Sequence, residues 1–109
     1  MTMKQISPVA LQEWLDDANR PNPILLDVRE TTEHQICKIE GSLLMPMHLI
    51  PLRINELSSE AEIITICHHG MRSGQVAQYL AQNGFGHILN LQGGVDYWAL
   101  TVDGAMRRY

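Results

Sequence analysis

The residues best suited to chemistry form one short segment, which reads Cys-His-His-Gly-Met-Arg-Ser from Cys67 to Ser73. A cysteine acts as a nucleophile once its thiol is ionised. The segment follows the apolar run Ile63-Ile64-Thr65-Ile66 and precedes an apolar pattern at helical spacing, so it is predicted to join a buried strand to a helix. Open α/β sheets bind ligands just beyond the carboxyl ends of their strands. We therefore predict that Cys67 is the catalytic residue.

Three features of this segment favour a thiolate or a bound anion. Successive N–H groups of residues 68–73 can surround the sulfur, and Gly70 allows the tight backbone turn that this requires. The helix that follows directs its partial positive charge at the loop. Arg72 adds a permanent charge, although its side chain can also point away from the sulfur. The predicted substrate-binding residues are therefore His68, His69, Gly70, Met71, Arg72 and Ser73.

The adjacent histidines allow two other interpretations. A general base would have to reach the thiol, and neighbouring side chains on a tight loop usually point in different directions. A zinc ion held by Cys67, His68 and His69 would lack the usual ligand spacing and a clear fourth ligand. We expect a polar, partly cationic pocket rim at the histidines and no metal site.

The remaining sequence must position this loop, and it alternates between strand and helix patterns. Strands are expected at residues 24–28, 42–45, 63–66 and 87–91. Helices are expected from Ser7-Pro8 to about Ala18, from Thr31 or Thr32 to Ile36, over 50–57 with a break near Pro51, from after Ser73 to Asn83-Gly84, and from about Val95. This order predicts an α/β fold with a central, mostly parallel sheet of four to five strands and helices on both faces.

Length and composition restrict the class of protein. A chain of 109 residues with 45% hydrophobic and 18% charged residues is typical of one globular domain, residues 1–109. The net charge of −4 and the scattered lysines and arginines argue against a nucleic-acid partner. No apolar run reaches the length of a membrane span, and the N-terminus lacks the apolar core of a signal peptide. We expect a cytoplasmic protein with no membrane partner.

Two residues and one pair of glycines outside the loop are expected to have structural roles. Cys37 stands at a predicted helix end, where a packed thiol is the favoured interpretation, and a reducing compartment disfavours a disulfide with Cys67. Trp98 is expected in the core. Gly93-Gly94 either forms an ordinary turn, or adopts backbone conformations that other residues avoid, or lets the backbone approach a neighbouring loop closely.

Taken in order, these motifs resemble those of the single-domain rhodaneses, a family of sulfurtransferases, over nearly the whole chain. The matching segments are Leu25–Glu30, Glu33–Ser42 (usually Glu-(Phe/Tyr)-x-x-Gly-His-Ile-x-Gly-Ala), the loop Cys67–Ser73, and Gly84-Phe85 with Leu91-x-Gly93-Gly94 and Trp98. The resemblance implies a rhodanese-like fold and supporting roles for Asp27 and Arg29 near the active site.

The resemblance also implies a mechanism. Cys67 accepts a sulfane sulfur from a small anion such as thiosulfate, becomes a persulfide, and passes the outer sulfur to cyanide or a thiol. His68, His69 and Met71 occupy variable positions that would select donor and acceptor. No metal or organic cofactor is implied.

Several alternatives stay open at this point. The chain could be a persulfide carrier for an acceptor protein, or an interaction module with little turnover of small molecules. Phosphatases and arsenate reductases share a related fold, but four residues separate Cys67 from Arg72, as in sulfurtransferases, and the phosphatase loop is longer. Cys37-Lys38 replaces the usual Gly-His, so Cys37 could act as a resolving thiol for oxidised Cys67.

Overall fold

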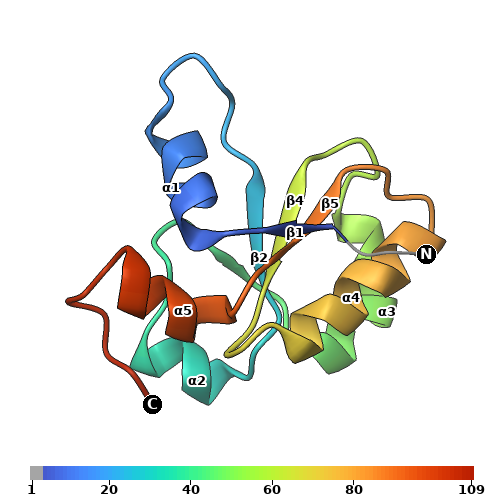
Figure 1. The fold of residues 1–109 in the computed structure, drawn as a ribbon. Coiled ribbons are helices and arrows are strands. Elements are labelled where there is room, and N and C mark those ends of the chain that lie inside the picture. Colours follow the sequence, from blue (N-terminus) through green and yellow to red (C-terminus); the bar gives the residue numbers. More distant parts are fainter. Residues whose placement is uncertain (1–3) are drawn as a thin grey trace.

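A parallel five-stranded sheet forms the centre of the protein in the computed structural model, which describes residues 4–109. Its strand order is β1-β5-β4-β2-β3, and every pairing of neighbouring strands is parallel (Figure 1). The strands are β1 (Gln5–Ile6), β2 (Ile24–Asp27), β3 (Leu43–Leu44), β4 (Ile63–Ile66) and β5 (Ile88–Leu91). The predicted α/β class and the parallel sheet are confirmed.

Helices cover both faces of this sheet, as predicted. They are α1 (Pro8–Asp16), α2 (Thr31–Ile36), α3 (Ile50–Arg53), α4 (Met71–Gln82) and α5 (Gly94–Thr101). Helices α1 and α5 lie on one side of the sheet, and α3 and α4 lie on the other (Figure 1). Side chains of α1 and α5 form one core cluster with the sheet, and side chains of α3 and α4 form a second. Short 3-10 turns at Met47–Leu49 and Ile54–Glu56 flank α3.

The central strand β4 leads directly into the loop that begins at Cys67. All four of its residues are buried, as expected for a parallel strand with helices on both faces. Because side chains alternate along a strand, Ile64 and Ile66 join the cluster with α1 and α5, whereas Ile63 and Cys67 join the cluster with α3 and α4. The side chain of Cys67 therefore faces the side of the sheet that α4 covers.

Some predicted boundaries differ from the structure. The helix α4 begins at Met71 rather than after Ser73, because Gly70 adopts φ +100° and serves as the N-cap. Helix α1 ends at Asp16, before the predicted Ala18. Strand β1 was not predicted, since two residues are too few to show a pattern.

Two further helix predictions need correction. Glu30, rather than Thr31 or Thr32, is the N-cap of α2, where the Glu33 side chain accepts a hydrogen bond from the Glu30 N–H at 3.0 Å. Pro51 does not break α3, because a proline is tolerated in the first turn; the helix gives way to a 3-10 turn at Ile54 instead. Among residues 4–109, no helix has the length and apolar character needed to cross a membrane.

Candidate active site

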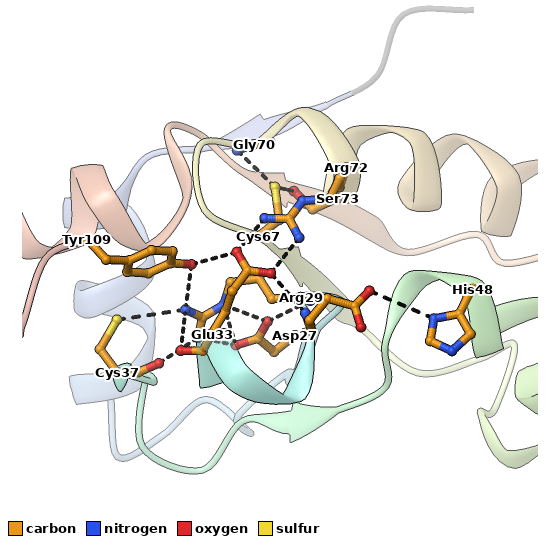
Figure 2. A network of polar contacts seen from close by, with 11 residues as sticks. Asp27, Arg29, Glu33, Cys37, His48, Cys67, Gly70, Arg72, Ser73 and Tyr109 are labelled. Carbon is orange, nitrogen blue, oxygen red and sulfur yellow. Dashed lines mark hydrogen bonds and ion pairs between the residues drawn. The ribbon is translucent and has the colours of Figure 1, made fainter. Parts of the chain in front are cut away.

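Cys67 follows β4 directly, and a loop of only three residues separates it from α4. The Cys67 side chain is almost fully enclosed, with 1% of the residue exposed. Its Sγ accepts a hydrogen bond from the Gly70 N–H at 3.0 Å (Figure 2). The Ser73 hydroxyl lies 3.2 Å from the same sulfur. Two donors thus converge on Sγ, an arrangement suited to an anionic sulfur.

Asn90 on β5 connects the parts of this loop. It is buried, and its Nδ2 donates to the Gly70 carbonyl at 3.1 Å. Its Oδ1 accepts from Thr65 Oγ1 at 3.1 Å and also from Ser73 Oγ. Ser73 has one hydroxyl proton, which can go to Asn90 or to Cys67 Sγ but not to both at once. Because Thr65 still donates to Asn90, Ser73 can turn its proton toward the sulfur without leaving Oδ1 unpaired.

The start of α5 holds the other side of the loop. The Val95 N–H donates to the Cys67 carbonyl at 2.9 Å, and the Asp96 N–H donates to the His68 carbonyl at 3.1 Å. These are helix N–H groups that have no partner within their own helix. Gly94 has φ +62°, and a Cβ there would collide with the carbonyl groups of Cys67 and His68. The structure thus confirms the close approach at Gly94, and both Gly93 and Gly94 also have the positive φ that other residues avoid.

Arg72 points to Glu33 on α2. Its two terminal nitrogens donate to the two Glu33 carboxylate oxygens at 2.7 and 2.8 Å (Figure 2). Hydrogen bonding from Arg72 is the largest cause that lowers the pKa of Glu33 to about 2. The Tyr109 hydroxyl also donates to Glu33, at 2.9 Å. The guanidinium thus ties the first turn of α4 to α2, and substrate contact by Arg72 stays a prediction.

Asp27 and Arg29 form a buried ion pair beneath this surface. Arg29 Nη2 lies 2.7 Å from Asp27 Oδ2, and both side chains are fully buried. Arg29 also donates to the Cys37 carbonyl at 2.7 Å and to the Tyr109 hydroxyl at 3.0 Å. Burial opposes the charge of Arg29, but its hydrogen bonds to Asp27 and Tyr109 keep its pKa above the ordinary value. The pair anchors the end of α2, which agrees with a supporting role.

The second thiol lies in different surroundings. Cys37 is the C-cap of α2, and its Sγ lies 3.7 Å from Arg29 Nη1. It packs against the core cluster of α1 and α5, whereas Cys67 belongs to the cluster on the other face of the sheet. Both cysteines are free. The packed-thiol interpretation of Cys37 agrees with this placement.

The loop's variable positions form its outer rim. The rings of His68 and His69 lie side by side, with centroids 3.9 Å apart, so the expectation that they diverge is wrong. Tyr109 stacks on His68, also at 3.9 Å, with the two rings 9° from parallel. Burial, and then the charge of His69, lower the pKa of His68. Met71 is 76% exposed and gives the rim one apolar side chain.

Known proteins share the sequence pattern and the fold of this chain. The model of the rhodanese-like domain matches residues 7–101. The chain belongs to the rhodanese-like family.

Similar proteins span nearly the same length as this rhodanese-like chain. A sulfurtransferase of Allochromatium vinosum is 36% identical over 97 residues, which are 89% of each chain. The thiosulfate sulfurtransferase GlpE of Ectopseudomonas mendocina is 31% identical over 98 residues, covering 90% of this chain and 86% of that protein. The crystal structure of SSP1007 from Staphylococcus saprophyticus has a TM-score of 0.84 and 33% identity, covering 97% of this chain and all of that one. Sulfur transfer in general is the activity that these comparisons support.

Three residues that shape this rhodanese-like site were not predicted from the sequence. Asn90 had a usable signal, because an amide between Leu89 and Leu91 in a buried strand needs polar partners. Glu33 lies in a segment that resembles the family pattern, but its bond to Arg72 could not be predicted because the two residues are far apart in the sequence. For Tyr109 no local pattern existed, since its contacts depend on how the chain returns to α2.

Proposed function

We propose that this protein is a sulfurtransferase that carries a sulfane sulfur on Cys67 as a persulfide. The Cys67 thiolate attacks the outer sulfur of a donor such as thiosulfate, the S–S bond of the donor breaks, and sulfite leaves with the electron pair. Cyanide or a thiolate then attacks the outer sulfur of the persulfide. The Cys67–sulfur bond breaks, which releases thiocyanate or a new persulfide and restores the thiolate.

The observation that carries this proposal is the pair of donors on Cys67 Sγ. The Gly70 N–H at 3.0 Å and the Ser73 hydroxyl at 3.2 Å provide hydrogen bonds that an anionic sulfur accepts. These two hydrogen-bonding groups belong to the short loop and the first turn of α4, so they lie beside Sγ before any sulfur-donating substrate arrives. The names of the relatives in Allochromatium and Ectopseudomonas support the same chemistry.

The other predicted site residues take distinct proposed roles. Gly70 and Ser73 bind the reacting sulfur, and His68, His69 and Met71 contact donor and acceptor at the rim. Because both terminal nitrogens of Arg72 are bonded to Glu33, Arg72 is a positioning residue that fixes the first turn of α4. Asp27 and Arg29 support α2 from below and do not contact substrate.

A steady-state assay with thiosulfate and cyanide tests the proposal. The wild-type protein should produce thiocyanate, Cys67→Ser should produce none, and Cys37→Ser should retain activity as the matched thiol control. Melting curves should show that Cys67→Ser is folded, because the two side chains are similar in size. Thiocyanate production by Cys67→Ser above the uncatalysed rate would exclude Cys67 as the sulfur carrier.

A persulfide carrier for a protein acceptor is the second candidate. One relative favours it: the putative sulfur carrier protein YrkF of Bacillus subtilis is 33% identical over 97 residues, which are 89% of this chain and 51% of that protein. A carrier would load one sulfur rapidly but release it to cyanide slowly, so single-turnover rates for loading and release distinguish carrier from enzyme.

Phosphate-ester hydrolysis is the less favoured alternative. The loop has four residues between Cys67 and Arg72, and Arg72 is held by Glu33. A phosphatase needs a wider cradle and a cation directed at the phosphate oxygens. We expect no cleavage of an aryl phosphate above the level of Cys67→Ser.

A further inference from the structure

Three side chains that bind metals in other proteins meet beside the active-site loop. His68 and His69 come from the loop after β4, and Asp96 comes from the first turn of α5. Each offers one ligand atom, and these atoms all lie within 4.8 Å of one another. The sequence alone offers Cys67 with the two histidines, a set from which no metal site is expected; Asp96 reaches this place through the fold.

The ring of His68 has a buried nitrogen without a hydrogen-bond partner among residues 4–109. Its ring is held between Tyr109 and His69, with a centroid distance of 3.9 Å on each side. A backbone hydrogen bond to Tyr109 acts on the ring, while Nε2 is buried and has no hydrogen-bond partner within residues 4–109. A buried nitrogen without a partner is unfavourable, and metal coordination would satisfy it. A second bond from the same ring to a backbone group is common among metal-binding histidines.

Asp96 is oriented toward the histidines by two contacts. Its backbone N–H donates to the His68 carbonyl at 3.1 Å, which fixes α5 against the loop. Arg108 donates to both carboxylate oxygens of Asp96, from Nε to Oδ1 at 2.9 Å and from Nη2 to Oδ2 at 3.4 Å, while Oδ2 also lies 3.8 Å from His69 Nε2. That separation is too long for a hydrogen bond, so Oδ2 and the histidine nitrogen face each other without bonding. A shared cation would bridge them.

We propose that His68, His69 and Asp96 form a binding site for one divalent transition-metal ion of the zinc type. Two imidazoles and a carboxylate are a donor set that zinc accepts, and three protein ligands leave one position for water or another ligand. Small side-chain rotations would bring the ligand atoms to one centre, because these atoms already lie within 4.8 Å of one another and the His69 side chain is 62% exposed. The site does not include Cys67 and does not depend on sulfur transfer.

Calorimetric titration of the untagged protein with Zn²⁺, in the presence of a phosphine reductant, tests the site directly. The wild-type protein should bind one ion, and His69→Ala and Asp96→Asn should each weaken binding at least about tenfold. Cys67→Ser should bind as the wild type does. The Co²⁺ derivative should lack a thiolate charge-transfer band for the same reason.

Two further variants serve as matched controls. Arg108→Gln breaks the same ion pair as Asp96→Asn but keeps the carboxylate, so it should retain at least the wild-type affinity. His48→Ala removes an exposed histidine outside the cluster and should have no effect. The proposal is overturned by an absence of saturable binding to the wild type, by unchanged affinity in both His69→Ala and Asp96→Asn, or by loss of binding in Cys67→Ser.

Discussion

Replacing Glu33 by glutamine should weaken the fold in a way that depends on pH. The pKa of Glu33 falls from 4.5 to about 2 in the folded protein, with the hydrogen bonds from Arg72 as the largest cause. A group whose pKa is lowered by folding stabilises the protein above its unfolded pKa. That stabilisation is lost as the pH falls from about 4.5 toward about 2, because protonated Glu33 no longer pairs with Arg72.

The expected size follows from the same values. The full change in the pKa of Glu33, from 4.5 to about 2, would correspond to about 3.4 kcal/mol of unfolding free energy at 1.36 kcal/mol per pKa unit. The Arg72 side chain is 36% exposed and the Glu33 side chain 19% exposed, so solvent screens the pair considerably. We therefore expect Glu33→Gln to lose only about 1 kcal/mol of unfolding free energy at pH 7.

Urea unfolding at pH 7 and pH 3 measures this difference. Glu33→Gln should be less stable than the wild type at pH 7, and the gap should shrink at pH 3. The matched control is Glu56→Gln, which breaks the exposed Arg53–Glu56 pair and should leave stability unchanged within error. Equal stability of Glu33→Gln and the wild type at pH 7, or an undiminished gap at pH 3, would refute the reasoning.

Three other substitutions test how the loop is held. Asn90→Leu removes the shared partner of Ser73, Thr65 and the Gly70 carbonyl; urea unfolding should show a loss of about 2–4 kcal/mol, and wild-type stability would contradict this role. Gly94→Ala should cost about 1–3 kcal/mol in the same assay because its Cβ meets the Cys67 and His68 carbonyls, whereas Gly86→Ala, which has open space, should be neutral. Ser73→Ala should slow persulfide formation about tenfold or more in stopped-flow measurements, since a donor to Sγ is lost; an unchanged rate would exclude that hydrogen bond from the reaction.

Much of the scaffold follows from local pattern. The run Ile63-Ile64-Thr65-Ile66 predicts β4 with the observed bounds, because a short apolar β-branched run suits a strand buried on both faces. The end of helix α4 at Asn83-Gly84 also follows from local sequence, since a helix ends readily where a glycine can take a positive φ. These signals also place Cys67 correctly at the carboxyl end of β4.

The contacts that hold the loop depend on tertiary structure. Arg72 could have faced the sulfur or turned away, and only the position of α2 places Glu33 within its reach. Asn90 bonds to Gly70 and Ser73 because β5 lies beside β4 in the sheet, an order that the sequence pattern does not reveal. Asp96 meets the histidines for the same reason, through the position of α5.

The central claim is that Cys67 itself carries the transferred sulfur. Intact-mass spectrometry after incubation with thiosulfate, and again after cyanide, tests this claim most directly. We predict a gain of one sulfur atom that maps to Cys67, disappears on treatment with cyanide, and is absent in Cys67→Ser. No added sulfur on the wild type, or an added sulfur that maps to Cys37, would contradict the account.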